Sequence, residues 1–232
     1  MDYDKIVIVT AKITPKYGLK GCAMNKQAGF TLIELAIVLV IIGLLLGGVL
    51  RGQELINSAR VKNLTRDFQN TQVFLFSYQD RFRAIPGDDA QANNHVAGGQ
   101  VGTNGTPGNG RIEGAWDSPP GLNESFLFWQ HVRLANFAPG NPALAATNTN
   151  GAALGIQSLG AGFAQITTLV NGSFGICSRG ILGRDALQID TTLDDGIPNT
   201  GSIQVAAVPG PADTLATINA APAAQYVVCM AI

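Results

Sequence analysis

The chain has little charge and no surplus of either sign. Charged residues make up 13% of its 232 residues, with 15 Lys+Arg against 16 Asp+Glu, whereas an ordinary soluble domain carries about 25%. A nucleic-acid-binding protein needs a basic face, and a disordered acidic tail needs a run of carboxylates. The composition favours neither class, so we expect no nucleic-acid partner. The length is enough for one or two domains with a core of their own.

The sequence also has few of the residues that enzymes use for catalysis. It has two histidines and three cysteines, and it contains no phosphate-binding loop, no H-E-x-x-H motif and no zinc-ligand spacing. Spacing does not support a triad of His131 with Cys177 and an aspartate. Because His131 follows the aromatic run 126–129, we expect it to be a structural histidine. Core packing is also the interpretation for Trp116 and Trp129, rather than a sugar-binding surface. The sequence therefore predicts no enzyme.

One long apolar run stands out in this composition. Residues 30–50 read FTLIELAIVLVIIGLLLGGVL, with Glu34 as the only charged side chain. A helix of this length rises roughly 30 Å, the thickness of a bilayer's hydrocarbon core, whereas a signal peptide has a shorter apolar region. Lys16, Lys20 and Lys26 precede the run, and the positive-inside rule therefore places the N-terminus in the cytoplasm. The sequence predicts a single-pass membrane helix with the rest of the chain outside.

The charge inside this run needs a partner. An ionised carboxylate in a membrane costs several kcal/mol unless it is paired or reaches the headgroups. The surrounding residues are Lys26-Gln-Ala-Gly29 followed by Phe30-Thr-Leu-Ile-Glu34. This segment resembles the cleavage and methylation motif of type IV pilins and of the pseudopilins of type II secretion. The resemblance implies that a prepilin peptidase cuts between Gly29 and Phe30 and methylates the new amino group of Phe30. It also implies that Glu34 pairs with the N-terminal ammonium of a neighbouring subunit in a filament.

The resemblance also implies a plan for the whole chain. Residues 1–29 are a leader, although Met24 alone would start a short basic leader of the usual kind and is an alternative translation start. Residues 30–52 are then the transmembrane and assembly segment. Such subunits stay in the inner membrane with the head in the periplasm. They then join other pilin or pseudopilin subunits in a periplasmic or extracellular filament, through an inner-membrane assembly platform.

The helical pattern continues beyond the membrane segment, through residues 53–85. Apolar positions recur there at spacings of three and four residues, which predicts an amphipathic helix: Val61, Leu64, Phe68, Thr71, Leu75, Tyr78 and Phe82. A coiled-coil stalk would give the same stripe, but the run is short for one. Pro86 ends the helix because proline lacks a backbone donor and disfavours helix at the preceding residue. We expect Asp88 and Asp89 to belong to the turn that follows.

Residues 86–232 form the predicted globular head. They are rich in Gly, Asn, Thr, Ala and Pro, with short apolar runs such as 163–170 and 203–208, a composition that favours short strands and long loops. Residues 98–110 hold six glycines in thirteen positions and predict a surface loop. We therefore expect an α+β, pilin-like fold in which one long N-terminal helix packs against a small antiparallel sheet.

The cysteines and one acidic segment are the remaining candidates. Cys22 lies in the leader, so cleavage leaves Cys177 and Cys229. In an oxidising periplasm, a bridge between them would close a loop of about 53 residues and stabilise the fold by roughly 4 kcal/mol. The bridge would also hold a C-terminal strand at residues 225–230, as C-terminal disulfide loops do in many pilins. Two buried free thiols are the alternative.

Asp190, Asp194 and Asp195 lie together next to a glycine, and calcium takes oxygen ligands on flexible loops. Some pseudopilins bind calcium near their C-terminal end, so the resemblance makes this group a possible calcium site. An Asp-Gly turn followed by Pro198 explains the same residues without a metal. Both interpretations stay open, and no other cofactor is expected.

The function predicted by these features is a structural subunit of a type IV pilus-like filament. The first alternative is a type II secretion pseudopilin in a short periplasmic piston filament, which would have the same N-terminus. The second alternative is an unprocessed membrane-anchored protein that binds a ligand with its Gly- and Asn-rich head. Cleavage after Gly29 distinguishes the last interpretation from the first two.

Overall fold

A computed structural model describes residues 29–160, 163, 165–207 and 209–232. The predicted leader, the alternative start at Met24 and Cys22 lie outside the described residues, apart from Gly29 at the cut bond. The chain divides between Gly48 and Val49 into two compact units, and each is described here by itself.

A single helix, α1, extends from Leu32 to Phe82, so the helix predicted to continue past residue 50 does so. It ends before Pro86, and Arg83, the residue after its last turn, has a left-handed φ of 52° that turns the chain away. The predicted stripe is buried in the second half of α1, where Leu64, Phe68 and Tyr78 are fully covered. The stripe therefore packs within the head and not in a coiled-coil stalk.

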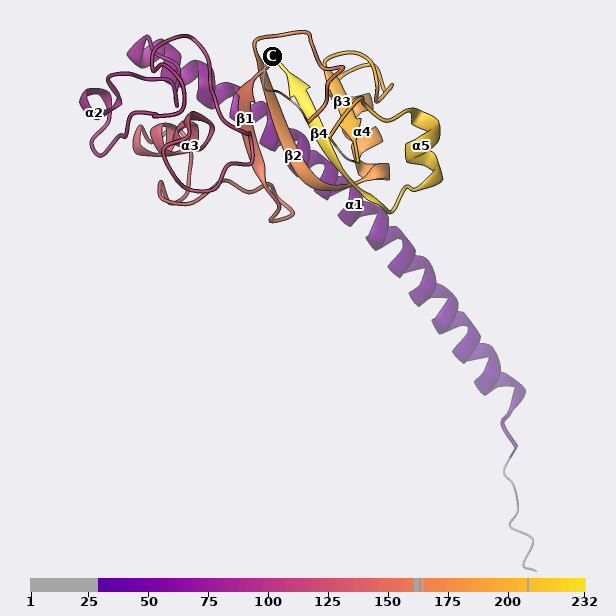
Figure 1. Ribbon diagram of the computed structural model, residues 1–232. Coiled ribbons are helices and arrows are strands. Elements are labelled where there is room, and N and C mark those ends of the chain that lie inside the picture. Colours follow the sequence, from indigo (N-terminus) through magenta and orange to yellow (C-terminus); the bar gives the residue numbers. More distant parts are fainter. Residues whose placement is uncertain (1–28, 161–162, 164, 208) are drawn as a thin grey trace, which may run out of the picture. The chain divides into compact units, whose positions relative to one another are not determined.

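The head contains a four-stranded antiparallel sheet with the strand order β1-β2-β4-β3. Its strands are β1 (Leu154–Ser158), β2 (Phe174–Leu182), β3 (Ile203–Ala206) and β4 (Gln225–Ala231). The second half of α1 passes behind these strands in Figure 1. The α+β fold with a long helix on a small antiparallel sheet is confirmed.

Both faces of the sheet are covered. Successive side chains of a strand point to opposite faces, and apolar side chains on each face are buried. Ile176 and Val228 point into the core that contains the α1 stripe, whereas their neighbours Cys177 and Cys229 belong to a second apolar cluster. Trp116 belongs to that second cluster as well. The two central strands are therefore buried on both sides.

Four further helices lie in the described part of the head, and the composition did not reveal them. They are α2 (Ala92–His95), α3 (Glu124–Leu134), α4 (Gly183–Leu193) and α5 (Leu215–Ala220). The glycine-rich residues 98–110 have no helix or strand and lie between α2 and α3, as the prediction of a loop required.

The apolar run at residues 163–170 contains no strand among its described residues. The described part of this segment makes only one isolated bridge, between Ile166 and Gly210. Phe163, Ile166 and Leu169 are buried in the second apolar cluster, so the run is apolar because it covers a face of the sheet as a loop. By contrast, the run that begins at residue 203 does contain a strand, β3.

Candidate functional site

The start of α1 is built as a capping box. The backbone N–H and the hydroxyl of Thr31 both donate to Glu34 Oε2 at 2.8 Å, and Glu34 N–H donates back to Thr31 Oγ1 at 3.3 Å. A threonine followed three residues later by a glutamate satisfies two N-terminal donors of a helix in this way. The T-x-x-E spacing in the sequence is a signal for this geometry that the sequence analysis did not use.

The carboxylate of Glu34 keeps an unused oxygen. Oε1 accepts no hydrogen bond in the part of the chain that the structure describes, and no described Lys, Arg or His forms an ion pair with Glu34. Both donors on Oε2 are neutral groups of Thr31. The helix therefore begins with an anionic side chain that can still accept a cation.

The helix that follows Glu34 is apolar and uncovered. Every residue from 32 to 48 is exposed, and large side chains such as Leu32 and Leu44 are 89% and 73% exposed. By length and composition, α1 is able to cross a membrane. A contiguous apolar surface of this size needs cover from lipid or from other protein chains.

Comparison with known families accounts for this segment. The family model of the prokaryotic N-terminal methylation motif matches residues 24–50. The chain carries the type IV pilin and pseudopilin signature. The match contains Gly29, Phe30 and Glu34, and it supports a subunit of the pilin or pseudopilin type. The apolar start of α1 is consistent with membrane anchoring of such a pilin-like protein. No curated protein matches the chain.

The predicted disulfide of this pilin-like chain is present. Cys177 on β2 and Cys229 on β4 are bonded, 52 residues apart in the sequence, and lie opposite each other in the sheet register. Both are fully buried. The alternative of two free thiols is wrong, because the pairing of the strands places the two side chains face to face.

The acidic residues predicted near the C-terminal end come together at the end of α4. One oxygen from each of Asp190, Asp194 and Asp195 lies within 4.8 Å of the others. Asp194 accepts from Ile203 N–H, and Asp195 accepts from Thr200 Oγ1 and a backbone N–H. Burial, with the charges of its two neighbours, raises the pKa of Asp190 to about 7. The group can collect a cation, and calcium there stays a prediction.

Asp88 and Asp89 do more than end a helix, because both are 2% exposed and tie distant segments together. Asp89 Oδ2 accepts from Tyr78 Oη at 2.7 Å and lies 2.6 Å from His95 Nδ1. Burial disfavours the Asp89 carboxylate, but these hydrogen bonds hold its pKa below the ordinary value. Burial, followed by the hydrogen bond to Asp89, raises the pKa of Tyr78.

His131 has a structural position. Its Nδ1 accepts from Gly87 N–H at 2.9 Å, so Nε2 carries the proton and donates to the Gln100 carbonyl at 2.7 Å. The ring stacks on Tyr78 with the centroids 5.9 Å apart. Burial lowers the pKa of His131, which keeps the ring neutral. Trp116 and Trp129 are core residues, each 5% exposed.

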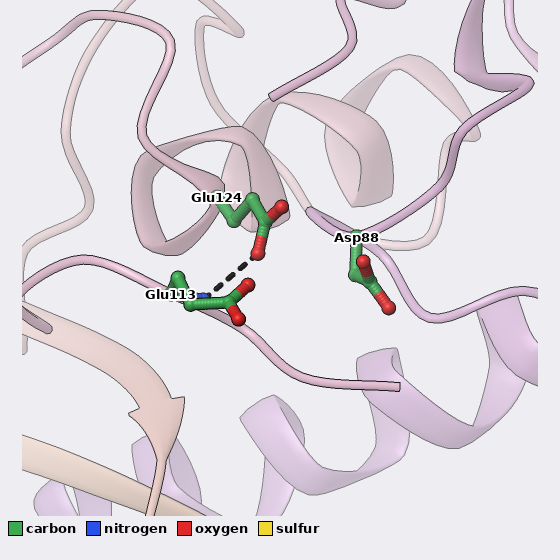
Figure 2. A group of neighbouring side chains, drawn as sticks. All are labelled: Asp88, Glu113 and Glu124. Carbon is green, nitrogen blue, oxygen red and sulfur yellow. Dashed lines mark hydrogen bonds between the residues drawn. The ribbon is translucent and has the colours of Figure 1, made fainter. Parts of the chain in front are cut away.

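A second acidic group, which the sequence analysis missed, consists of Asp88, Glu113 and Glu124 (Figure 2). Its members are far apart in the sequence, so no local motif joins them. Glu124 is the first residue of α3, where an acidic residue is common for reasons of helix polarity alone.

Proposed function

We propose that the chain is a structural subunit of a type IV pilus-like filament, cut by a prepilin peptidase between Gly29 and Phe30 and methylated at Phe30. One observation carries the proposal: a fully exposed apolar helix of bilayer length that begins with an anionic Glu34, inside the methylation motif. The subunits remain in the inner membrane until an assembly platform adds them to the filament.

The chemistry of the helix start supports this proposal. Cleavage before Phe30 creates an ammonium group four residues ahead of Glu34, at the polar end of the apolar helix. In a filament, the ammonium of one subunit meets the free oxygen of Glu34 in the next subunit. A charge-assisted hydrogen bond in a region of low dielectric is about twice as strong as a neutral one. Neighbouring copies of residues 32–48 then cover each other's apolar surface.

The first test is mass spectrometry of the N-terminal peptide from membrane-extracted protein, in cells with and without a prepilin peptidase. We expect a methylated Phe30 only where the peptidase is present. An intact N-terminus at Met1 or Met24 in both strains would contradict the proposal. It would favour an unprocessed membrane-anchored ligand-binding protein.

A substitution at the cut bond sharpens this test. A Cβ on Gly29 would meet nothing within 4 Å, so Gly29→Val leaves the folded chain unaffected and acts only through the peptidase. We expect unprocessed protein in the membrane and no filament. Gly43→Val is the matched control, because Gly43 is equally open but lies inside the helix. If Gly29→Val is cleaved normally, the assignment of the cut site to the bond after Gly29 is wrong.

The location of the assembled subunit separates a pilus from a secretion pseudopilus. Filaments that shear from the cell surface and contain this chain are the expected result for a pilin. For a pseudopilin, the filament stays in the periplasm, and deleting the chain stops the export of a type II substrate. Both outcomes need the same processed N-terminus, so they refine the proposal after the cleavage test.

A further inference from the structure

The sequence contains four Asn-Gly dipeptides, and all of them lie in loops of the head: Asn104-Gly105, Asn109-Gly110, Asn150-Gly151 and Asn171-Gly172. In such a pair the backbone nitrogen of the glycine is able to attack the side-chain amide carbon of the asparagine, because glycine has no side chain that shields the nitrogen. The attack needs an asparagine amide and a glycine N–H that are both free to move. Hydrogen bonds at the four pairs therefore decide which of them reacts.

Hydrogen bonds hold the asparagine side chain in two of the pairs. Asn104 Oδ1 accepts from Glu124 N–H at 3.0 Å. Asn109 is held at both ends of its amide, because Oδ1 accepts from Arg111 N–H and Nδ2 donates to Glu113 Oε1, each at 2.8 Å. Both side chains must break these bonds before their amide carbon turns toward the next backbone nitrogen.

Hydrogen bonds also hold the glycine N–H in two of the pairs. Gly110 N–H donates to Asp88 Oδ2 at 2.7 Å, and Gly151 N–H donates to the Asn148 carbonyl at 2.8 Å. At the net value of a protein hydrogen bond, each bond that must break first slows the attack by about two- to tenfold. The pairs at Asn104, Asn109 and Asn150 are therefore all protected in the folded head.

The fourth pair has neither restraint. Asn171 and Gly172 are exposed, and no described residue forms a hydrogen bond with the Asn171 side chain or with Gly172 N–H. Gly172 has a φ of 117°, and a Cβ there would lie 2.6 Å from the backbone oxygen of Ile232. The fold therefore requires glycine at this position, and so keeps an asparagine next to an unshielded backbone nitrogen.

We propose that Asn171 is a site of spontaneous deamidation in the folded head. The nitrogen of Gly172 bonds to Asn171 Cγ, and its proton passes through solvent to the side-chain nitrogen, which leaves as ammonia. The resulting succinimide is opened by water at either carbonyl, which gives an aspartate or an isoaspartate. Water is the only co-reactant, so the reaction is independent of cleavage at Gly29 and goes beyond the proposed function.

The modification changes the start of β2. Ser173 N–H and Phe174 N–H both donate to the backbone oxygen of Ile232, at 2.7 and 3.1 Å. An isoaspartate at Asn171 adds one methylene group to the main chain just before these bonds, because the chain then runs through the side chain. Either product also adds one negative charge to a chain whose net charge is −1. An old molecule therefore differs from a new one in charge and in local geometry.

The test incubates the full chain in detergent at neutral pH and follows each asparagine by peptide mapping with mass spectrometry. We expect Asn171 to convert at least about tenfold faster than Asn109, whose pair is held on both sides. A parallel sample in urea and reductant keeps the four dipeptides but loses the hydrogen bonds, and there we expect four similar rates. The proposal is overturned if Asn171 converts no faster than the other three in the folded chain, or only after unfolding.

Variants assign the isoaspartate to this position. A protein isoaspartate methyltransferase labels only isoaspartyl residues, so the methyl groups that it transfers measure this product. Asn171→Gln should remove most of this signal from the folded chain, because a glutamine must close a six-membered ring, which forms far more slowly. Asn150→Gln is the matched control at another exposed asparagine before glycine, and it should keep the parent's signal. The opposite result for either variant would contradict the proposal.

Discussion

The two halves of α1 differ in what covers them. Apart from Glu34, residues 32–48 are apolar on every side, and every residue of this range is exposed, whereas residues 61–82 carry an apolar stripe that the head buries. Both halves belong to one unbroken helix, so backbone hydrogen bonding does not distinguish them. Their side-chain patterns do. The first half needs a solvent or partner that covers all its faces, and the second half needs only one packing surface.

The comparison predicts that damage to one half leaves the other intact. The head half derives its stability from side chains packed within its own chain. The apolar half depends on lipid and on neighbouring copies, because its side chains are not packed in a hydrophobic core of their own chain. The predictions below test this separation, in order of decreasing expected effect.

The largest effect is expected for Phe68→Ala. Phe68 is fully buried in the stripe, and truncating a buried phenylalanine costs about 3–5 kcal/mol, because it removes apolar contacts and leaves a cavity. Thermal unfolding of the head, followed by near-ultraviolet circular dichroism, should show a correspondingly lower Tm. Membrane insertion and cleavage after Gly29 should not change.

The matched control is Phe76→Ala, at a phenylalanine of the same helix that is 51% exposed. This variant should lose less than about 1 kcal/mol. If both variants are equally destabilised, the stripe is not what anchors α1 in the head. The contrast between the two halves would then fail.

The disulfide should have the next largest effect. A 52-residue separation between Cys177 and Cys229 corresponds to about 4 kcal/mol of stabilisation in the chain-entropy account. The double variant Cys177→Ala/Cys229→Ala should unfold at lower denaturant concentration. Dithiothreitol should destabilise the parent to the same level and leave the variant unaffected. A reductant effect of equal size in both proteins would show that another group is responsible.

Sequence patterns predicted the parts of this fold that local physics determines. The 3-and-4 spacing from Val61 to Tyr78 predicted the stripe because a helix places such positions on one face. The even count of cysteines after cleavage predicted the bridge. The apolar runs alone did not separate strand from loop: the run that begins at residue 203 contains β3, whereas the described part of residues 163–170 is a buried loop, because an apolar run indicates burial and not strand pairing.

The features that the sequence did not reveal depend on contacts between segments that are far apart in the chain. Glu113 and Glu124 carry no local signal of belonging together with Asp88. The loop that closes over them does so through Gly102 and Gly105, and a glycine-rich composition by itself predicts only a flexible turn. The end of α4 shows the opposite case, since its three aspartates are close in the sequence and were found there.

A smaller effect, confined to the apolar half, is expected for Glu34→Gln. Losing a charged hydrogen bond costs about 1.5–3 kcal/mol, which corresponds to a roughly 10- to 100-fold loss of subunits in filaments. The Tm of the head should be unchanged. Glu54→Gln is the control, because Glu54 is an exposed glutamate of the same helix outside the assembly segment. Quantitative blotting of sheared or cross-linked filaments measures the loss, and equal incorporation of both variants would contradict the assigned pairing.

The smallest effect is a pH dependence that only the head should show. Burial, followed by the hydrogen bond with Glu113, raises the pKa of Glu124 in the folded head to about 8, above the ordinary 4.5, so between these values the folded state holds a proton that the unfolded chain has released. This stabilisation is complete below pH 4.5 and is lost as the pH rises through about 8. The Tm of the parent should fall by a few degrees between pH 6.5 and 8.

Other groups titrate near Glu124, so a difference between variants is the cleaner measurement. Asp88 and Glu113 face it directly, and neutral His131 contributes a slope of opposite sign below its ordinary pKa of 6.5. Asp190, with a pKa of about 7, adds a fall of its own in both proteins. Glu124→Gln should therefore show a shallower fall of the Tm than the parent above pH 6.5. Parallel profiles would mean that Glu124 ionises in the folded head as easily as in the unfolded chain.

Far-ultraviolet helicity of a peptide of residues 30–52 in vesicles should stay constant over this range, because that segment places no buried carboxyl group against another.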